Sequence, residues 1–264
     1  MTSSSVFSLT GRKILVTGAA GHLGRSLCEY LVVDGAIVLA VDVNEEALET
    51  LQSELKDFSA SFFPFTKNLA DEAQRTELAE EVATQTESLD GAVFAAAFVG
   101  TSVMDGWAVD FADQSVSSWR SAIELNLTAP FHLSQLLQPL LARGKNPSIV
   151  NIASVYGSDA PDWSLYEGLP MSNPAAYAVS KGGLIQLTRW LAATLAPAIR
   201  VNTVSPGGIA RGQDTNFVAR YSAKTTLGRM ATERDIVGQV AFFLSEAACY
   251  VTGQEARVDG GFGL

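Results

Sequence analysis

A tyrosine and a lysine spaced four residues apart offer acid–base chemistry. The dipeptide Asn173-Pro174 predicts the start of a helix, with Asn173 as N-cap and Pro174 at the first helical position. Tyr177 then lies in the first turn, and Lys181 lies on the same face one turn later. An ammonium group beside a phenol favours the phenolate and lowers the tyrosine pKa. Such a tyrosine can take the proton of an alcohol while hydride leaves the carbon.

A serine upstream is expected to join this pair. Ser154 follows an apolar run at residues 148–153 that is typical of a buried strand. Its hydroxyl would hold the oxygen of a substrate in line with the phenol of Tyr177. Taken alone, however, the spacing of Tyr177 and Lys181 favours an ordinary pair on a helix surface.

A proline inside a helical pattern suggests a fourth functional group beside Ser154, Tyr177 and Lys181, which is the backbone carbonyl of Asn126. Pro130 lies within the pattern 113–143 and has no N–H, so the carbonyl of Asn126 loses its helical partner. A kink with a free carbonyl results. That carbonyl would hold an ordered water and pass protons from Lys181 to solvent. The plainer alternative is a kink with a structural role alone.

A glycine-rich turn links an apolar run at 13–17 to a helical pattern at 22–34. Glycines let the chain turn tightly and let a diphosphate approach the backbone. The helix would direct its first N–H groups at that anion. The residues expected at this diphosphate are Gly18, Gly21, His22, Leu23 and Gly24. A tight turn without a ligand, with His22 facing solvent, is the alternative.

Further residues would contact the rest of a dinucleotide. Asp42 ends the second apolar run, and its carboxylate would accept both ribose hydroxyls of NAD while repelling the 2′-phosphate of NADP. We therefore expect NAD as the cofactor. Asn68, followed by Leu69, comes after the third run and would hydrogen-bond adenine or cap a turn. Ala95 and Ala96 close the fourth run, where small side chains leave room for the ribose or for close helix packing.

Short β-branched runs alternate with longer helical patterns, which is typical of a parallel sheet covered on both faces. The expected strands are residues 13–17, 37–41, 61–66, 91–95, 148–153, 200–204 and 256–259. The expected helices are residues 22–34, 44–56, 71–87, 113–143, 174–196, 215–224 and 232–247. This order predicts an α/β Rossmann fold, doubly wound in three layers, with a seven-stranded parallel sheet. Two long loops, 98–112 and 155–173, follow strands and are expected at the carboxyl edge where ligands bind.

Length and composition favour one domain, residues 1–264, with a large apolar core. Of the 264 residues, 47% are hydrophobic and 17% are charged, and the net charge is −10. Without a basic stripe we expect no nucleic-acid partner. The two cysteines show no metal-ligand spacing, so we expect no metal and a cytoplasmic protein. We also expect no membrane partner and no signal peptide, because the sequence has no apolar run of about 20 residues and no basic N-terminal region.

These residues resemble the motifs of the short-chain dehydrogenase/reductase family over nearly the whole chain. The matching segments are Thr17-Gly18…Gly24, Asp42, Asn126, Ser154, Tyr177-x-x-x-Lys181, Ser205-Pro206-Gly207-Gly208 and residues 251–261. The resemblance implies a catalytic tetrad of Asn126, Ser154, Tyr177 and Lys181. It also implies that Pro206, Gly207 and Ile209 line the nicotinamide, with Ile209 meeting its carboxamide through the backbone. Such enzymes usually form tetramers, so we expect a homotetramer or a homodimer.

The expected activity is hydride transfer between NAD and a secondary alcohol or ketone, with Tyr177 as acid/base. The segment between Ser154 and Tyr177 is longer than in most members of the family, and it contains Trp163 and Tyr166 among carboxylates. Aromatic faces beside carboxylates suit a sugar, because rings stack on its C–H faces and carboxylates, here including Asp159 and Asp162, accept its hydroxyls. Arg211 would pair with a phosphate or carboxylate of the substrate. A sugar or sugar derivative is therefore the expected substrate.

The same long segment resembles a subgroup associated with bacterial surface-sugar and flagellin-glycan pathways. Three alternatives stay open at the level of sequence. The tetrad serves a ketone or 3-oxoacyl thioester reductase equally well. The long segment, with its aromatic side chains, would also suit a subunit contact. A non-catalytic protein that senses NAD is the third alternative.

The cofactor preference can be tested at Asp42. NAD is expected to bind more tightly than NADP, because like charges held close in a partly dry site repel each other. Replacement Asp42→Ala removes one of those charges and is expected to narrow the difference in affinity. Titration of both dinucleotides into the wild type and the variant measures the effect. Tighter binding of NADP by the wild type would contradict the prediction.

Overall fold

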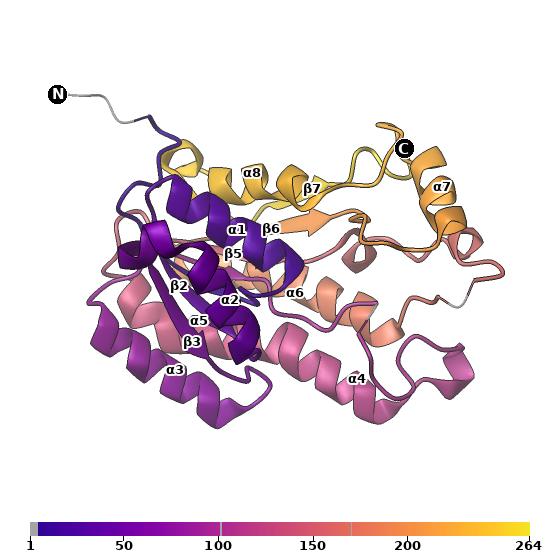
Figure 1. Cartoon of the computed structure of the whole chain (residues 1–264), viewed down its shortest axis with the longest axis horizontal. Coiled ribbons are helices and arrows are strands. Elements are labelled where there is room, and N and C mark those ends of the chain that lie inside the picture. The colour runs from indigo at the N-terminus through magenta and orange to yellow at the C-terminus, as the bar shows by residue number, and fades with distance from the viewer. Residues whose placement is uncertain (1–4, 101, 170) are drawn as a thin grey trace.

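Seven parallel strands form one sheet in the computed structural model, which describes residues 5–100, 102–169 and 171–264 (Figure 1). The strands are β1 (Lys13–Thr17), β2 (Ile37–Asp42), β3 (Phe62–Thr66), β4 (Gly91–Phe94), β5 (Ser148–Ile152), β6 (Arg200–Pro206) and β7 (Glu255–Val258). Their order in the sheet is β3-β2-β1-β4-β5-β6-β7. The order reverses between β1 and β4, and ligands bind at such a point, outside the carboxyl ends of the strands. The predicted Rossmann fold is confirmed.

Helices cover both faces of the sheet. They are α1 (His22–Val33), α2 (Glu45–Glu54), α3 (Glu72–Gln85), α4 (Val116–Ile123), α5 (Ala129–Leu141), α6 (Ala175–Leu195), α7 (Thr215–Ala223) and α8 (Glu233–Leu244). One apolar core lies between the sheet and α1, α2 and α8, and a second lies between the sheet and α3, α5 and α6. Figure 1 shows α1 and α8 on one side and α3 and α5 on the other.

Alternate side chains of one strand enter the two cores, which explains the unbroken apolar runs in the sequence. In β1, Ile14 and Val16 belong to the core beneath α1, whereas Leu15 belongs to the opposite core. A strand buried on both faces needs apolar residues at every position rather than at alternate ones. No described helix is both long enough and apolar enough to cross a bilayer.

The long helix predicted over 113–143 is interrupted. A π-helical turn, Glu124–Thr128, separates α4 from α5, and Pro130 lies in the first turn of α5. Because proline has no N–H, the carbonyl four residues before it has no helical donor, and a wider turn accommodates the break. The predicted kink is confirmed, and it takes the form of a π turn that carries Asn126.

The start of α6 lies one residue later than predicted. Pro174 is the N-cap, with an extended backbone at φ −66° and ψ 134°, and the helix begins at Ala175. The prediction that Asn173 is the N-cap and Pro174 the first helical residue is therefore wrong by one position, because the extended ψ of Pro174 leaves it outside the helix. Tyr177 still lies in the first turn, and Lys181 follows one turn later on the same helix.

Backbone contacts within the glycine turn bring α1 close to the end of β1. Gly18 has a left-handed backbone, with φ +66°. A Cβ atom on Gly24 would lie 1.9 Å from the carbonyl oxygen of Gly18. No side chain fits in that space, so the first turn of α1 can pack against the strand end only if residue 24 is glycine.

Replacement of Gly24 is expected to destabilise the fold. In Gly24→Ala the added methyl group must displace backbone, which typically costs about 1–3 kcal/mol of the free energy of unfolding, or more. Gly238→Ala is a matched control, because a Cβ there, within α8, meets no atom within 4 Å. The control is expected to gain about 0.5–1 kcal/mol from helix propensity. Urea unfolding of the three proteins measures both effects; a Gly24→Ala protein as stable as the wild type would refute the steric argument.

Candidate active site

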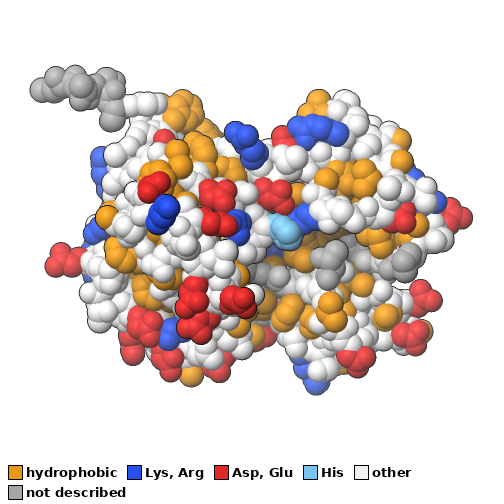
Figure 2. All heavy atoms as spheres, in the orientation of Figure 1, with side chains coloured by type: hydrophobic (Ala, Val, Ile, Leu, Met, Phe, Trp, Pro, Cys, Tyr) orange, Lys and Arg blue, Asp and Glu red, His pale blue; other side chains and the backbone are white. Residues whose placement is uncertain are grey.

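The ends of β1, β2 and β4 meet around the glycine turn. The hydroxyl of Thr17 accepts hydrogen bonds from the backbone N–H groups of Ala95 and Ala96, at 3.1 and 3.2 Å. A Cβ atom on Gly18 would lie 2.9 Å from the Cα of Ala96. Close packing against the backbone of Ala96 therefore requires glycine at position 18. Figure 2 shows the surface hollowed in the middle of the molecule, between the part that holds α1 and the part that holds α7.

Asp42 is held over this turn at the end of β2. Its two carboxylate oxygens accept from the backbone N–H groups of Ala20 and Asn44, each at 3.0 Å. These bonds fix the carboxylate beside the glycine turn, at the position expected for recognition of a ribose. The first residue of α1, His22, is exposed next to it, and Leu23 is buried under the turn.

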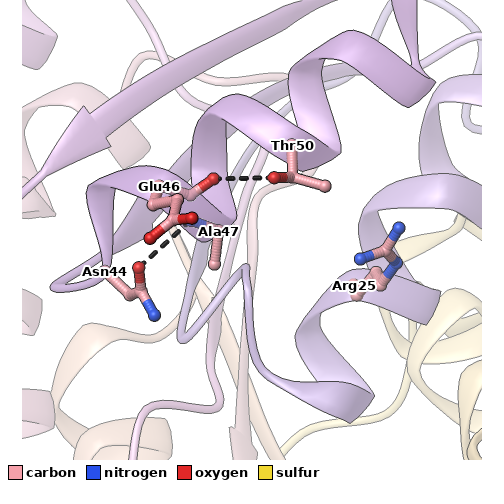
Figure 3. Close-up of a pocket in the computed structure, with 5 residues that line it drawn as sticks. All are labelled: Arg25, Asn44, Glu46, Ala47 and Thr50. Carbon is pink, nitrogen blue, oxygen red and sulfur yellow. Dashed lines mark hydrogen bonds between the residues drawn. The ribbon is translucent and has the colours of Figure 1, made fainter.

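A small pocket lies between α1 and α2, outside the glycine turn (Figure 3). It is lined by Arg25, Asn44, Glu46, Ala47 and Thr50. The cation that lines it, Arg25, forms ion pairs with Glu29 and Glu54. Asn44 uses its side-chain oxygen to cap α2, accepting from the N–H of Ala47 at 3.1 Å. This pocket near Asp42 therefore offers a guanidinium that two carboxylates already neutralise.

Asn68 and Leu69, the residues expected near an adenine, form hydrogen bonds within the protein. The Oδ1 of Asn68 accepts from the N–H of Ala70 at 3.0 Å, which is the capping role left open by the sequence. Leu69 is buried, and its carbonyl accepts from Arg75 Nη1 at 2.7 Å. The loop after β3 is thus shaped by its own backbone contacts, with Asn68 and Leu69 at the edge where an adenine would lie.

Ser154, Tyr177 and Lys181 come together at the end of β5. Lys181 is 3% exposed, and its Nζ donates to the carbonyl of Ile152 at 2.7 Å. The same Nζ lies 5.8 Å from the ring centroid of Tyr177. The hydroxyl of Ser154 lies beside the phenol and accepts from the N–H of Tyr156 at 3.2 Å. The three groups predicted to act together therefore share one buried site.

Burial dominates the electrostatics of this site. Desolvation raises the pKa of Tyr177, and the side chains of Ser154 and Arg211 oppose that rise. Desolvation also lowers the pKa of Lys181 to about 7. Contrary to the expectation of a lowered value, the pKa of Tyr177 is raised, because burial of the phenol outweighs the neighbouring groups that favour the phenolate.

The side chain of Asn126 has a structural role. Its Oδ1 accepts from the N–H of Phe98 at 2.8 Å, and its Nδ2 donates to the carbonyl of Phe98 and to the hydroxyl of Ser180, both at 3.0 Å. These bonds fasten the loop after β4 to α6. The backbone carbonyl that Pro130 leaves without a helical donor belongs to this same residue, in the π turn next to the site.

The segment after β6 approaches β7 and α7 closely. A Cβ atom on Gly207 would lie 2.8 Å from the Cα of Asp259. Gly208 donates its N–H to the hydroxyl of Tyr221 at 2.6 Å, and the carbonyl of Ile209 accepts from Gln213 at 2.7 Å. Pro206 is buried at the end of the strand. The segment is therefore held rigidly from the side opposite the site.

The loop between Ser154 and Tyr177 is tied down by ion pairs. Asp159 accepts two bonds from Arg257, at 3.0 and 2.6 Å, and Asp162 pairs with Lys224. The expectation that these carboxylates accept sugar hydroxyls is corrected, because both already neutralise a cation.

The three residues expected to contact substrate have different surroundings. Trp163 is 56% exposed. Tyr166 lies between two aromatic rings, with centroids 5.8 Å from Trp163 and 5.4 Å from Phe217. Arg211 forms an ion pair with Glu233, at 2.9 Å, and its charge acts on Tyr177. Arg211 and Tyr166 therefore lie near the acid–base group, and Trp163 lies at the surface of the loop.

The sequence did not reveal a buried arginine, Arg75, which lies between the loop after β3 and the π turn. Arg75 is 1% exposed. Besides its bond to the Leu69 carbonyl, it donates to His132 at 3.0 Å and pairs with Glu124 at 2.8 Å. Glu124 opens the π turn, so Arg75 links the loop after β3 to the turn that carries Asn126. An arginine in an amphipathic helix reads as a surface charge, and no local signal distinguishes it.

A glycine turn at a strand crossover with a buried Ser–Tyr–Lys group defines an oxidoreductase that uses a nicotinamide dinucleotide. A family model described as Enoyl-(Acyl carrier protein) reductase matches residues 18–263. Nodulation protein G of Rhizobium meliloti is 33% identical, over 98% of this chain and 100% of that protein. The chain belongs to the short-chain dehydrogenase/reductase family, and the resemblance seen in the sequence is confirmed.

Other relatives differ in their activities. A 3-oxoacyl-(acyl-carrier-protein) reductase of Thermotoga maritima is 30% identical over 96% of this chain and 98% of that protein. Post-translational flagellin modification protein A of Campylobacter coli is 29% identical over 97% and 100%. These relatives show an NAD(P)-dependent oxidoreductase family without fixing a substrate.

Solved structures give the same fold with either dinucleotide. A short-chain dehydrogenase from Leptospira borgpetersenii with bound NAD+ has a TM-score of 0.85 and 30% identity, over 100% of this chain and 97% of that one. A gluconate 5-dehydrogenase from Burkholderia cenocepacia, in complex with NADP and tartrate, has a TM-score of 0.84 and 25% identity over 97% and 96%.

The pKa of Lys181 predicts how stability depends on pH. An unfolded lysine has a pKa of about 10.4, whereas the folded value is about 7. Between these values the unfolded chain holds a proton that the folded chain has lost, so the free energy of unfolding rises with pH. Lys181→Met abolishes this contribution. The stability of the variant relative to the wild type is therefore expected to fall by several kcal/mol between pH 7 and pH 10.

Urea unfolding of the cofactor-free proteins at several pH values measures this difference. Lys56→Met, at an exposed position, controls for the loss of a lysine as such. A difference between Lys181→Met and wild type that is constant with pH would show that Lys181 is charged in the folded protein.

Proposed function

We propose that the protein is an NAD-dependent dehydrogenase that interconverts a secondary alcohol and a ketone, with Tyr177 as the acid/base. The observation that carries the proposal is the group formed by buried Ser154, half-buried Tyr177 and buried Lys181, at the same carboxyl edge of the sheet as the glycine turn. The turn suits a dinucleotide, because it lies at the N-terminus of α1, where backbone N–H groups without helical partners can bind a diphosphate. When bound, nicotinamide accepts or supplies the hydride and, in its oxidised form, brings a positive charge that favours the phenolate.

Each residue of the site then has one task. Ser154 holds the substrate oxygen beside the phenol, and the Oη of Tyr177 takes the proton of the alcohol or returns it to the ketone. Lys181, anchored by the carbonyl of Ile152, exchanges a proton readily near neutral pH because its pKa is about 7. The carbonyl of Asn126 would hold the water through which that proton reaches solvent.

NAD rather than NADP is the cofactor that the surroundings of Asp42 favour. The carboxylate is fixed by Ala20 and Asn44 at the end of β2, so it cannot swing away from an added phosphate. Arg25, the nearby cation in the pocket of Figure 3, is already paired with Glu29 and Glu54. A 2′-phosphate would therefore meet a negative charge without a free counter-charge.

The substrate is proposed to be a sugar or sugar derivative. Arg211 lies near Tyr177, and its pairing with Glu233 leaves its remaining N–H groups for an acidic substrate group. The relatives named above include a flagellin modification protein and a gluconate dehydrogenase. A 3-oxoacyl thioester reductase is the second candidate, because a relative of that activity covers 96% of the chain.

Domain organisation and assembly follow from the same fold. Residues 1–264 are proposed to form one domain, acting in the cytoplasm. Large apolar side chains are exposed on the outer helices, including Trp119, Phe131 and Trp190, of which Trp190 is 55% exposed. Exposed aromatic residues of this kind are typical of subunit contacts. They support a homotetramer or homodimer.

Replacement of the acid/base tests the proposed chemistry. Tyr177→Phe removes one hydroxyl group and is expected to lower kcat by about 10²–10⁴-fold, the usual contribution of general acid–base catalysis. NAD binding is expected to persist, because the glycine turn and Asp42 are unchanged. Turnover is followed as NADH absorbance with a panel of sugars, polyols, simple ketones and acyl thioesters, and NAD affinity is measured by titration. Tyr250→Phe, at a fully exposed tyrosine, is the matched control.

Equal activity of Tyr177→Phe and the wild type would exclude the tyrosine from catalysis. Activity confined to acyl thioesters or simple ketones would remove the sugar proposal and favour the reductase.

A further inference from the structure

Two tyrosines outside the tetrad share a hydrogen bond beside the acid/base. The hydroxyl groups of Tyr156 and Tyr166 lie 2.8 Å apart. Tyr156 is two residues from Ser154 and donates its N–H to the serine hydroxyl at 3.2 Å. The electrostatic influence of Tyr166 reaches Tyr177, and that of Tyr177 reaches Tyr156. The phenol pair therefore lies beside Ser154 and close to Tyr177.

A buried asparagine completes this group. Asn173 is 5% exposed, and its carboxamide lies beside the hydroxyl of Tyr166. In the described part of the chain, no donor reaches its Oδ1. A buried acceptor without a partner costs about 1–3 kcal/mol. Ser148 Oγ and Asn151 Oδ1 also lack a partner in the described residues, but Asn173 Oδ1 is the one of the three whose side chain adjoins the phenol pair, where a ligand hydroxyl would supply the missing donor.

The chemistry of the group selects the ligand. In the phenol pair, one hydroxyl donates to the other, and the second hydrogen is left for another acceptor. The cluster of Tyr156, Tyr166 and Asn173 thus offers one donor and one acceptor. An alcohol hydroxyl, which donates and accepts, satisfies both. The carbonyl of a thioester only accepts and would leave Asn173 Oδ1 without a partner.

We propose that Tyr156, Tyr166 and Asn173 form a subsite for a second hydroxyl of the substrate, on the carbon next to the one that is oxidised. The substrate is then a vicinal diol, and the product is an α-hydroxyketone. The subsite rests on the proposed function, since it positions a hydroxyl relative to the carbon served by Tyr177. It replaces the loop carboxylates, which are ion-paired, as the group that recognises a polyol.

Matched pairs of substrates test this subsite. The pairs are 2,3-butanediol with 2-butanol and 1,2-cyclohexanediol with cyclohexanol, and the readout is the ratio of kcat/KM for the diol to that for the monoalcohol. A site built to hydrogen-bond a hydroxyl discriminates strongly against an analogue that lacks it. The wild-type ratio is expected to exceed about tenfold, which corresponds to one hydrogen bond.

Three variants remove the groups one at a time. Asn173→Ala, Tyr156→Phe and Tyr166→Phe are expected to bring the ratio to within about twofold of one, by loss of that hydrogen bond. The ratio cancels a general loss of activity, and the two phenylalanine variants remove one oxygen atom each and so preserve packing. Tyr30→Phe, at a tyrosine 43% exposed on α1, is the matched control and is expected to keep the wild-type ratio.

The outcomes separate the subsite from the reaction. A wild-type ratio near one, or variants that keep the full ratio, overturn the subsite and leave the dehydrogenase proposal standing. Turnover confined to acyl thioesters or to alcohols without a neighbouring hydroxyl would also overturn the subsite and leave the oxidoreductase proposal standing. Failure of the wild type to turn over these pairs or any member of the wider panel overturns the proposed function and the subsite together.

Discussion

The site depends on how closely α1 approaches the end of β1. A Cβ on Gly24 would lie 1.9 Å from the carbonyl of Gly18, so backbone touches backbone at the start of the helix. This contact places the N-terminus of α1 directly at the carboxyl edge of the sheet, where its free N–H groups face the crossover between β1 and β4. Asp42 and the alanines after β4 are then held by hydrogen bonds to the same turn and strand end.

Burial explains why the catalytic groups differ from an exposed pair with the same spacing. Desolvation raises the pKa of Tyr177 and lowers that of Lys181 to about 7, so in the cofactor-free protein the phenol is neutral and the lysine titrates near neutral pH. In the absence of cofactor, Tyr177 therefore keeps its proton. The positive charge of an oxidised nicotinamide would shift the phenol toward its reactive form at the moment when the hydride acceptor is in place.

The features that could be predicted from sequence depend on local rules. The glycine turn, the acidic residue ending β2 and the Tyr–Lys spacing each occupy a few neighbouring positions, and each lies in the element where the sequence predicts it. The break at Pro130 was predictable because proline lacks an N–H, although the π turn that results was not. The partners of Asp159 and Asp162 are Arg257 and Lys224, which lie 98 and 62 residues further along the chain. No local pattern shows such pairings, so the roles of these carboxylates could only come from the structure.

The order in which the chain is synthesised gives those distant ion pairs another meaning. The strands that surround the glycine turn, β1 to β4, lie within residues 13–94 and leave the ribosome first. The loop after Ser154 emerges later, and its carboxylates must wait for Lys224 and then for Arg257 in β7. The glycine turn and Asp42 therefore leave the ribosome well before the cations that hold the loop after Ser154. The position of that loop is fixed only once the last strand of the sheet has been made.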